Sequence, residues 1–125
     1  MAIFQKRSKR KASGGRYGKI IKRIKQMGNL PSLTKVGETR IKEKRVMGGH
    51  QKDSLLSANK VNVIDPKTKK AKVAVIKSVI ESPANRHFVR RNVVTRGAVV
   101  DTDLGKVKIT SRPGQERIVN GVLVK

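Results

Sequence analysis

The first 37 residues contain no acidic side chain, and this absence limits what the N-terminal part of the chain can fold into. Eleven basic side chains lie in this stretch, and the first carboxylate of the chain is Glu38. Few apolar groups and several glycines accompany these charges, so burial cannot offset the conformational entropy that ordering would cost. We therefore predict that residues 1–33 form a basic extension that is disordered when free and acts as an interaction segment.

The whole chain shares this charge bias. Lys and Arg number 31 against 8 Asp and Glu, which gives a formal charge of +23 and a pI of about 11.5. Such self-repulsion opposes compaction unless a polyanion relieves it, and nucleic acid is the polyanion that basic proteins most often meet. The chain has no cysteine, no signal-peptide pattern and no apolar run long enough to span a membrane. We expect a soluble, cytoplasmic protein that binds nucleic acid and does not contact a membrane.

Two signals separate the extension from the rest of the chain. Residues 20–27 carry apolar side chains at helical spacing before Gly28, a helix stop, so one short helix is expected there on binding. Residues 29–32 are typical of a linker, and from about Thr34 Val and Ile alternate with polar residues. We place one domain in residues 34–125. The apolar positions of the helical pattern are Ile20, Ile21, Ile24 and Met27.

The predicted domain has the texture of short strands separated by turns. Residues 60–64 form a strand, residues 65–69 a turn that contains a proline, and residues 71–80 the antiparallel partner strand. Residues 36–46 fit a basic edge strand better than a helix, because no clean period joins their apolar positions.

Three further segments are predicted to be strands, at residues 93–100, 106–110 and 117–124. Asn120-Gly121 lies between apolar residues and is the strongest short signal for a two-residue hairpin. Short strands at close spacing, with almost no aromatic bulk, favour a small closed barrel over a sandwich. The predicted fold is therefore all-β, a small closed β-barrel with a long basic N-terminal extension that contains at most one short helix.

Candidate catalytic and metal-binding residues lack the partners that such chemistry requires. His50 and His87 stand alone, without a nucleophile or a ligand set at a recognised spacing. Asp101 and Asp103 could hold a magnesium ion with help from phosphate, but they lie where a hairpin must turn, so we interpret them as turn residues. We expect no enzyme activity, no metal, no cofactor and no small-molecule substrate.

Two glycine motifs remain, Ser13-Gly14-Gly15 and Gly48-Gly49. Neither follows an apolar strand or carries the Gly-Lys-Ser sequence of a nucleotide-binding loop. Small residues would let backbone amides approach phosphates while neighbouring Lys and Arg neutralise charge, which suits a segment threaded between RNA helices. The alternative is a flexible linker.

Five longer motifs resemble one known family. They are residues 10–16 (RKASGGR), 31–37 (PSLTKVG), 85–92 (NRHFVRRN), 95–98 (TRGA) and 109–115 (ITSRPGQ). Together they resemble, over nearly the whole chain, the e-type ribosomal protein eight of the small subunit, a family of archaea and eukaryotes. The resemblance implies a small β-barrel with a long basic N-terminal extension, buried in small-subunit ribosomal RNA and without catalytic activity. The short chain is similar in length to archaeal members.

We predict RNA contacts both in the extension and in the barrel. Tyr17 and Phe88 lie among basic residues where a ring can stack on an unpaired base, with core packing an equal alternative for Phe88. The main patch of the barrel would be the arginines of residues 86–91, on a loop that projects from a rigid scaffold, with an ordinary solvated loop as the alternative. The predicted RNA-binding residues are Lys6, Arg7, Lys9, Arg10, Lys11, Ser13, Gly14, Gly15, Arg16, Tyr17, Lys19, Lys22, Arg23, Lys25, Arg86, His87, Arg90, Arg91 and Arg96.

Three functions of different classes fit this charge to different degrees. The first is a structural constituent of the small ribosomal subunit, partnered by small-subunit ribosomal RNA and neighbouring ribosomal proteins and not a homo-oligomer. The second is a free chromatin-type or duplex-DNA-binding protein, which the charge permits but the lack of a predicted recognition helix disfavours. The third is a nucleic-acid-processing enzyme, which needs a carboxylate cluster that the scattered acids do not provide.

Overall fold

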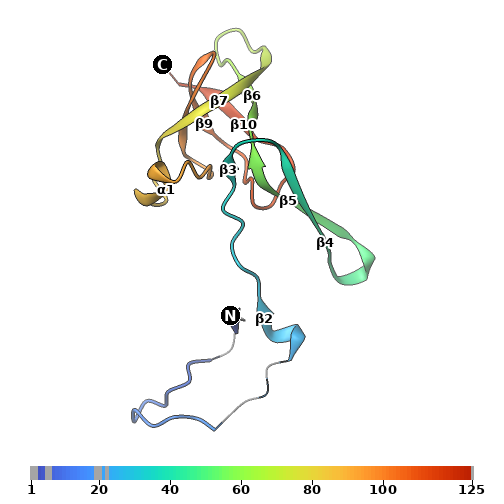
Figure 1. Ribbon diagram of the computed structural model, residues 1–125, viewed down its shortest axis with the longest axis vertical. Helices are drawn as coiled ribbons and strands as arrows, with labels where there is room; N and C mark the ends of the chain where they lie inside the picture. The colour runs from blue at the N-terminus through green and yellow to red at the C-terminus, as the bar shows by residue number, and fades with distance from the viewer. Residues whose placement is uncertain (1–2, 5–6, 19–20, 22, 125) are drawn as a thin grey trace. The chain divides into compact units, whose positions relative to one another are not determined.

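The computed structural model describes residues 3–4, 7–18, 21 and 23–124, and the chain divides into two compact units, Met1–Pro31 and Ser32–Lys125. Most of the described regular structure lies in the second unit, where strands predominate and the single described α-helix has four residues (Figure 1). The predicted all-β class is confirmed.

Five strands of the second unit form a closed barrel in the order β10-β6-β7-β8-β9, which confirms the predicted architecture. Neighbouring strands are antiparallel except for β10 and β6, whose parallel pairing closes the barrel. Closure removes the free edges that an open sheet would expose. The strands are β6 (Lys60–Ile64), β7 (Ala71–Glu81), β8 (Val99–Thr102), β9 (Gly105–Ile109) and β10 (Asn120–Leu123).

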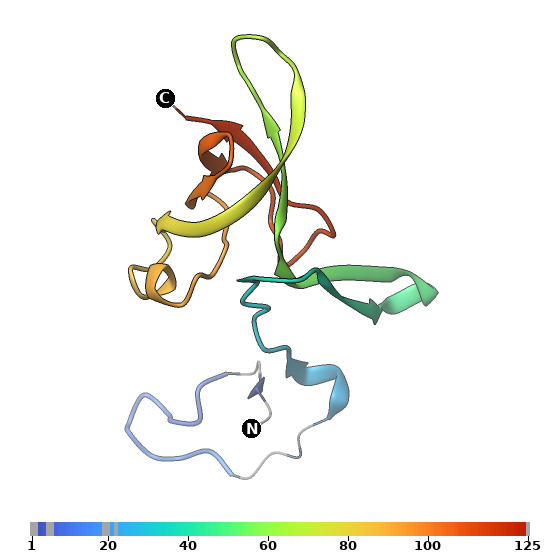
Figure 2. The ribbon, with the colours of Figure 1, turned by 45° about the horizontal axis from the view of Figure 1, so that its top comes forward.

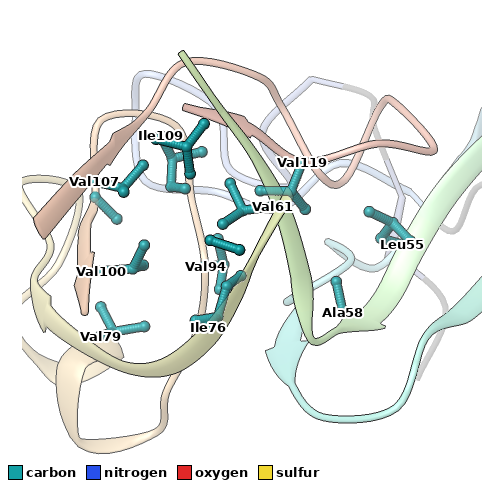
Figure 3. Close-up of a cluster of buried hydrophobic side chains, with 13 residues drawn as sticks. Leu55, Ala58, Val61, Ile76, Val79, Val94, Val100, Val107, Ile109 and Val119 are labelled. Atoms are coloured by element: carbon teal, nitrogen blue, oxygen red, sulfur yellow. The ribbon is translucent and has the colours of Figure 1, made fainter. Parts of the chain in front are cut away.

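Small aliphatic side chains fill the barrel. Buried residues alternate with more exposed ones along the strands, as with Val61 and Val63 on β6 and Val107 and Ile109 on β9. Figure 3 shows Val79, Val100 and Ile109 inside the curved sheet, and Leu55 and Ala58 of the same cluster beside β5. The described cluster contains no aromatic ring, so a narrow barrel is wide enough to enclose it.

The turn between β6 and β7 is built by Asp65, as its sequence predicts. The carboxylate of Asp65 accepts hydrogen bonds from the Lys67 N–H (3.0 Å) and from the Thr68 hydroxyl (2.9 Å). These two donors hold the pKa of Asp65 below its ordinary value of 3.8. The turn is therefore specified by side-chain chemistry within four residues.

A three-stranded sheet in the order β3-β5-β4 adjoins the barrel. Figure 2 shows β4 and β5 projecting from the barrel as a long two-stranded ribbon. β4 lies at the free edge, as predicted for residues 36–46, whereas β5 has no counterpart among the predicted strands. Its apolar residues Leu55 and Leu56 are adjacent, so no alternation marks the strand. The bounds are β3 (Lys35–Val36), β4 (Arg40–Arg45) and β5 (Gln51–Ala58), with a 3₁₀ turn, η2 (Met47–Gly49), between β4 and β5.

Buried hydrogen bonds of Thr34 and Leu55 tie the start of the second unit to the barrel. The Thr34 hydroxyl donates to the Leu55 carbonyl (2.7 Å), and the Thr34 carbonyl accepts from the Val94 N–H (2.8 Å). The Leu55 N–H donates to the Pro113 carbonyl (2.8 Å). Thr34 and Leu55 are each only 1% exposed, so these bonds are shielded from water.

The Asn120-Gly121 pair does not form the predicted hairpin. Both residues lie inside β10, and residues 117–119 before them are not in a strand. A Cβ atom on Gly121 would come within 2.4 Å of Val107 Cγ1 and 3.0 Å of the Lys108 carbonyl oxygen. The glycine therefore serves the close approach of β10 to β9 and not a turn.

The predicted strand at residues 93–100 is also shorter in the structure. Val93 and Val94 are buried, but residues 95–98 turn, and the Ala98 N–H donates to the Thr95 carbonyl (3.1 Å). Burial without regular pairing therefore produced the same apolar pattern as a strand would.

In the N-terminal unit, β1 (Ile3–Phe4) pairs antiparallel with β2 (Met27–Gly28). A single 3₁₀ turn, η1 (Ile24–Gln26), precedes β2, and the described part of residues 20–27 contains no α-helix. Ile20, part of the predicted helical pattern, lies outside the described residues. A helix this short is marginal without packing partners, and it was predicted for the bound state, so it stays a prediction.

Candidate nucleic-acid interface

The basic motif at residues 85–92 forms a helical turn and not the predicted loop. α1 (His87–Arg90) follows Asn85, whose side-chain oxygen accepts a hydrogen bond from the His87 N–H (2.9 Å). Two residues after the end of α1, Asn92 has a φ of 49° and donates its N–H to the Val89 carbonyl (3.1 Å). Two asparagines therefore delimit the helix.

Asn92 also fixes α1 to the barrel. Its side-chain oxygen accepts from the Val79 N–H (3.2 Å), and its carbonyl accepts from the Val36 N–H (3.1 Å). Val89 of α1 packs against the hydrophobic core. The side chains that leave α1 therefore start from a fixed backbone.

The cations of this motif are exposed on that backbone. A guanidinium fork can contact two phosphate oxygens at once, and no acid of the described chain neutralises these groups through an ion pair. Phe88 is half-buried in the same turn, so its ring is partly open to a partner. The exposed residues are Arg86, His87, Arg90 and Arg91.

Residues 9–17 of the extension form a small hairpin around the Ser13-Gly14-Gly15 motif. Arg10 and Arg16 pair in an isolated antiparallel bridge, and the Lys11 N–H donates to the Gly15 carbonyl (2.7 Å). Gly14 has a φ of +82°, a conformation that favours glycine. The motif thus turns the chain tightly and presents a group of exposed cations. These are Lys9, Arg10, Lys11 and Arg16.

Two cationic side chains lie over the ring of Tyr17, at the end of this hairpin. The Arg7 Cζ atom lies 3.6 Å from the ring centroid and the Lys11 Nζ atom 5.6 Å from it. Both distances are within the range of cation–π attraction. A base that stacked on Tyr17 would therefore also meet a positive charge.

The remaining predicted contact residues are spread more widely. Arg23 and Lys25 are exposed at η1, and Arg96 is exposed in the turn at residues 95–98. The other three predicted residues, Lys6, Lys19 and Lys22, lie outside the described residues. The hairpin of residues 9–17 and α1 belong to different units, so they are two separate groups.

The acids considered as metal ligands have other partners. Asp103 pairs with Lys77 (3.3 Å), and Asp101, on β8 and not in the turn as predicted, lies opposite Lys106 of β9. Among the described residues, no three His, Asp or Glu side chains gather where they could hold a metal ion. No helix in the described part of the chain is long and apolar enough to cross a membrane.

Comparison with known proteins identifies a single family. A family model described as Ribosomal protein S8e matches residues 4–124. The small ribosomal subunit protein eS8 of Methanococcus aeolicus is 46% identical over 99% of this chain and 98% of its own length. The chain belongs to the Ribosomal protein S8e family. The resemblance predicted from the five motifs is thereby confirmed.

Other S8e relatives match over equally long stretches. The small ribosomal subunit protein eS8 of Methanosphaera stadtmanae is 47% identical over 100% of both chains. The protein of the same name from Sulfolobus acidocaldarius is 46% identical over 100% of this chain and 99% of its own length.

This S8e chain also carries a third group of cations that was not among the predicted contacts. They lie on β4 and β5, and the available signal was the presence of a basic residue at every second position from Arg40 to Lys44. Without β5, the sequence does not reveal which side chains share a face. The residues are Arg40, Lys42, Lys44 and Lys52, all exposed.

Proposed function

We propose that this chain is a structural constituent of the small ribosomal subunit that binds and stabilises small-subunit ribosomal RNA. Its relatives carry the name small ribosomal subunit protein, and the self-repulsion of its formal charge of +23 favours a polyanionic partner. In this proposal the protein works in the cytoplasm as a single copy within the subunit, beside neighbouring ribosomal proteins. Its role is structural and not catalytic.

The observation that carries this proposal is the attachment of the helical turn α1 to the barrel. The arginines in and beside α1 leave a backbone that Asn92 and Val89 bind to the barrel, so little conformational entropy of the main chain is lost when RNA binds. Phosphate contacts made from such a scaffold would set the register of the barrel on the RNA.

The extension would add affinity to this placement. The hairpin of residues 9–17 brings four exposed cations close together, and its small residues leave the backbone open to phosphates. Tyr17 offers a ring for an unpaired base in the same hairpin.

The alternative function is a free chromatin-type or duplex-DNA-binding protein. α1 has four residues and is about 6 Å long, too short for a recognition helix that reads a major groove. The β4–β5 ribbon is the feature that would suit duplex DNA, because a two-stranded ribbon fits its major groove.

Competition at one fixed salt concentration separates the two functions. The chain is bound to labelled, protein-free small-subunit ribosomal RNA and challenged with unlabelled ribosomal RNA or duplex DNA at equal phosphate concentration. We expect ribosomal RNA to compete at concentrations at least about tenfold lower than DNA, because folded RNA can occupy both cation groups at once. Equal competition by the two nucleic acids would contradict the proposal.

A further inference from the structure

We propose that the β4–β5 ribbon is a second RNA-binding element of the barrel unit, with one defined face against the RNA phosphates. The contacting face consists of Arg40, Lys42, Lys44 and Lys52. This inference rests on the proposed function and adds to it a site on an element that the predicted contacts leave out.

The strand register sorts charge between the two faces of the ribbon. Lys42 pairs with Ser54 and Lys44 with Lys52, which places three lysines and no acid on one face. Arg40 falls on the same side of β4 by alternation. The opposite face carries the pair of Glu43 with Asp53, followed by Arg45 with Gln51.

At two positions of the ribbon, this register places like charges opposite each other where opposite charges could form ion pairs. Lys44 lies directly opposite Lys52, and Glu43 directly opposite Asp53, so like charges face each other at two neighbouring positions. Like charges in directly opposite positions destabilise a strand pair, and opposite charges stabilise it. A ribbon that served only as structure would gain from a mixed arrangement. A phosphate backbone against the lysine face would remove the repulsion there.

The lysines also do more than protect a sheet edge. β4 is a free edge strand, and charged residues on either face would discourage pairing with another chain. Protection of the edge does not require three lysines on one face and two acids opposite each other on the other face. Segregation is what a surface for a polyanion requires.

The ribbon is anchored at one end and free at the other. Leu55 is buried in the core at the anchored end, and Ile41 packs against the same cluster. At the other end Met47 is 95% exposed, and the turn is closed by a hydrogen bond from the Val46 N–H to the His50 carbonyl (2.7 Å). Gly48 and Gly49, with φ of 80° each, keep this tip narrow. A narrow ribbon of this kind can lie along a groove between RNA strands.

The opposite face of the ribbon contacts the rest of the protein through Asp53. Asp53 forms an ion pair with Arg117 (3.8 Å), and its side chain is 27% exposed. Phosphates would be repelled from Glu43 and Asp53, so the charge distribution permits one docking orientation of the ribbon and disfavours the other.

The test compares three variants of the full chain that are matched in charge or position. The first is Lys42→Gln with Lys44→Gln and Lys52→Gln. The second removes the same charge from the β6–β7 turn, through Lys67→Gln, Lys69→Gln and Lys70→Gln. The third, Glu43→Gln with Asp53→Asn, neutralises the opposite face. Binding of protein-free small-subunit ribosomal RNA is measured over a range of salt concentrations, and melting temperature and circular dichroism are recorded for each variant.

We expect the first variant to flatten the slope of log affinity against log salt by up to about two units, from three lost phosphate contacts. The β6–β7 variant should change the slope by less than half as much, and the acid variant should leave it unchanged or bind slightly tighter. Equal losses from the two lysine variants would overturn the ribbon proposal and leave the proposed function in place. Loss of the preference for ribosomal RNA over duplex DNA in the unmodified chain would instead overturn the proposed function.

Reversal of one charge distinguishes an effect on RNA binding from an effect on folding. Lys44→Glu places an acid opposite Lys52, so the ribbon should melt at the same or a higher temperature than before while RNA affinity falls. An unchanged affinity would overturn the proposal.

Chemical acetylation tests the same face without any substitution. Bound RNA should slow the acetylation of Lys42, Lys44 and Lys52 at least about fivefold more than that of the lysines in the β6–β7 turn. Equal protection of the two sets would overturn the ribbon proposal.

Discussion

The two units of this chain differ in how their side chains are stabilised. The Ser32–Lys125 unit contains every described side chain that is buried, including the aliphatic cluster inside the barrel. In the Met1–Pro31 unit no described residue is buried, and the apolar residues Ile21 and Leu30 are 85% and 74% exposed. The Ser32–Lys125 unit therefore has a core of its own, whereas no residue whose burial is described in the Met1–Pro31 unit contributes to one.

Because of this difference, the two units lose different amounts of conformational entropy when RNA binds. The backbone of residues 86–91 is held in advance by Asn92 and Val89, so contacts of its arginines require only the ordering of side chains. No described residue of the extension belongs to the buried core, so RNA must compensate the entropy of ordering its backbone. High charge density in the extension is the compensation, because each phosphate contact releases counterions.

Deletion of residues 1–33 should have the largest effect. The deletion removes ten basic groups, and if most of them contact phosphates the salt slope of RNA binding should flatten by up to about seven units at the single-strand coefficient. The β signature in circular dichroism should persist, because the barrel core lies wholly beyond this point. An unchanged slope would mean that the extension is not an RNA anchor, and a lost β signature would mean that the boundary at residue 33 is wrong.

Replacement of the arginines at residues 86, 90 and 91, in and beside α1, should have a smaller but more localised effect. Arg86→Gln, Arg90→Gln and Arg91→Gln together should flatten the salt slope by about two units and leave the melting temperature unchanged, since all three side chains are exposed. The matched control is again the triple change at Lys67, Lys69 and Lys70. If the two sets weaken binding equally, total charge and not this patch controls docking.

Gly121→Ala tests the unit that has a core. The added Cβ atom would overlap Val107 Cγ1 at 2.4 Å and the Lys108 carbonyl at 3.0 Å, so strand β10 must move away from β9. Overpacking of this kind lowers the free energy of unfolding by about 1–3 kcal/mol. Thermal denaturation measures the loss, and Gly18→Ala serves as an exposed control, because nothing lies within 4 Å of its added Cβ and its φ is not in the left-handed region. A melting temperature equal to that of the unmodified chain would contradict the close approach of the two strands.

Tyr17→Leu and Phe88→Leu apply the same substitution to both units. Tyr17→Leu should weaken RNA binding by about tenfold, the lower range of base–aromatic stacking, without changing the melting temperature. Phe88→Leu should weaken binding and also lower the melting temperature, because Phe88 is half-buried beside Val89. A lower melting temperature with full affinity would assign Phe88 to packing alone.

Asp65→Ala should give the smallest effect, and one that depends on pH. The pKa of Asp65 is lowered in the folded state by its hydrogen bonds from Lys67 and Thr68, so its ionised form stabilises the fold above the ordinary value of 3.8. This stabilisation is lost as the pH falls through the lowered folded-state pKa. The melting temperatures of the variant and the unmodified chain should therefore differ at pH 7 and converge in strong acid. A difference that stayed constant with pH would point to a cause other than the carboxylate.

The features that the sequence predicted correctly depend on short-range chemistry. β6 and its turn were readable because alternation and the hydrogen bonds of Asp65 lie within a few neighbouring residues. The basic character of the extension and of residues 86–91 was readable because charge needs no partner in the fold. The Asn85 and Asn92 that delimit α1 were present in the motif, but four residues are too few to show a helical period.

The features that were missed depend on contacts between distant residues. Gly121 is needed because Val107 lies against it, and no local pattern distinguishes this need from the glycine of a hairpin. The cationic face of the ribbon exists because β5 pairs with β4 in one register, which sets Lys52 opposite Lys44. Neither relation can be read along the chain.

The parallel pairing of β10 with β6 has a consequence for the order in which the protein folds. The side-chain bond between Asn62 and Asn120 joins residues 58 apart in sequence, whereas the β6–β7 and β8–β9 pairs are closed by short turns. Long loops are slower to close than short ones, and proteins rich in distant contacts fold more slowly. The two hairpins should therefore form first, and closure of the barrel should be the rate-limiting step, which leaves a period in which an open sheet edge is exposed before the protein reaches its partner.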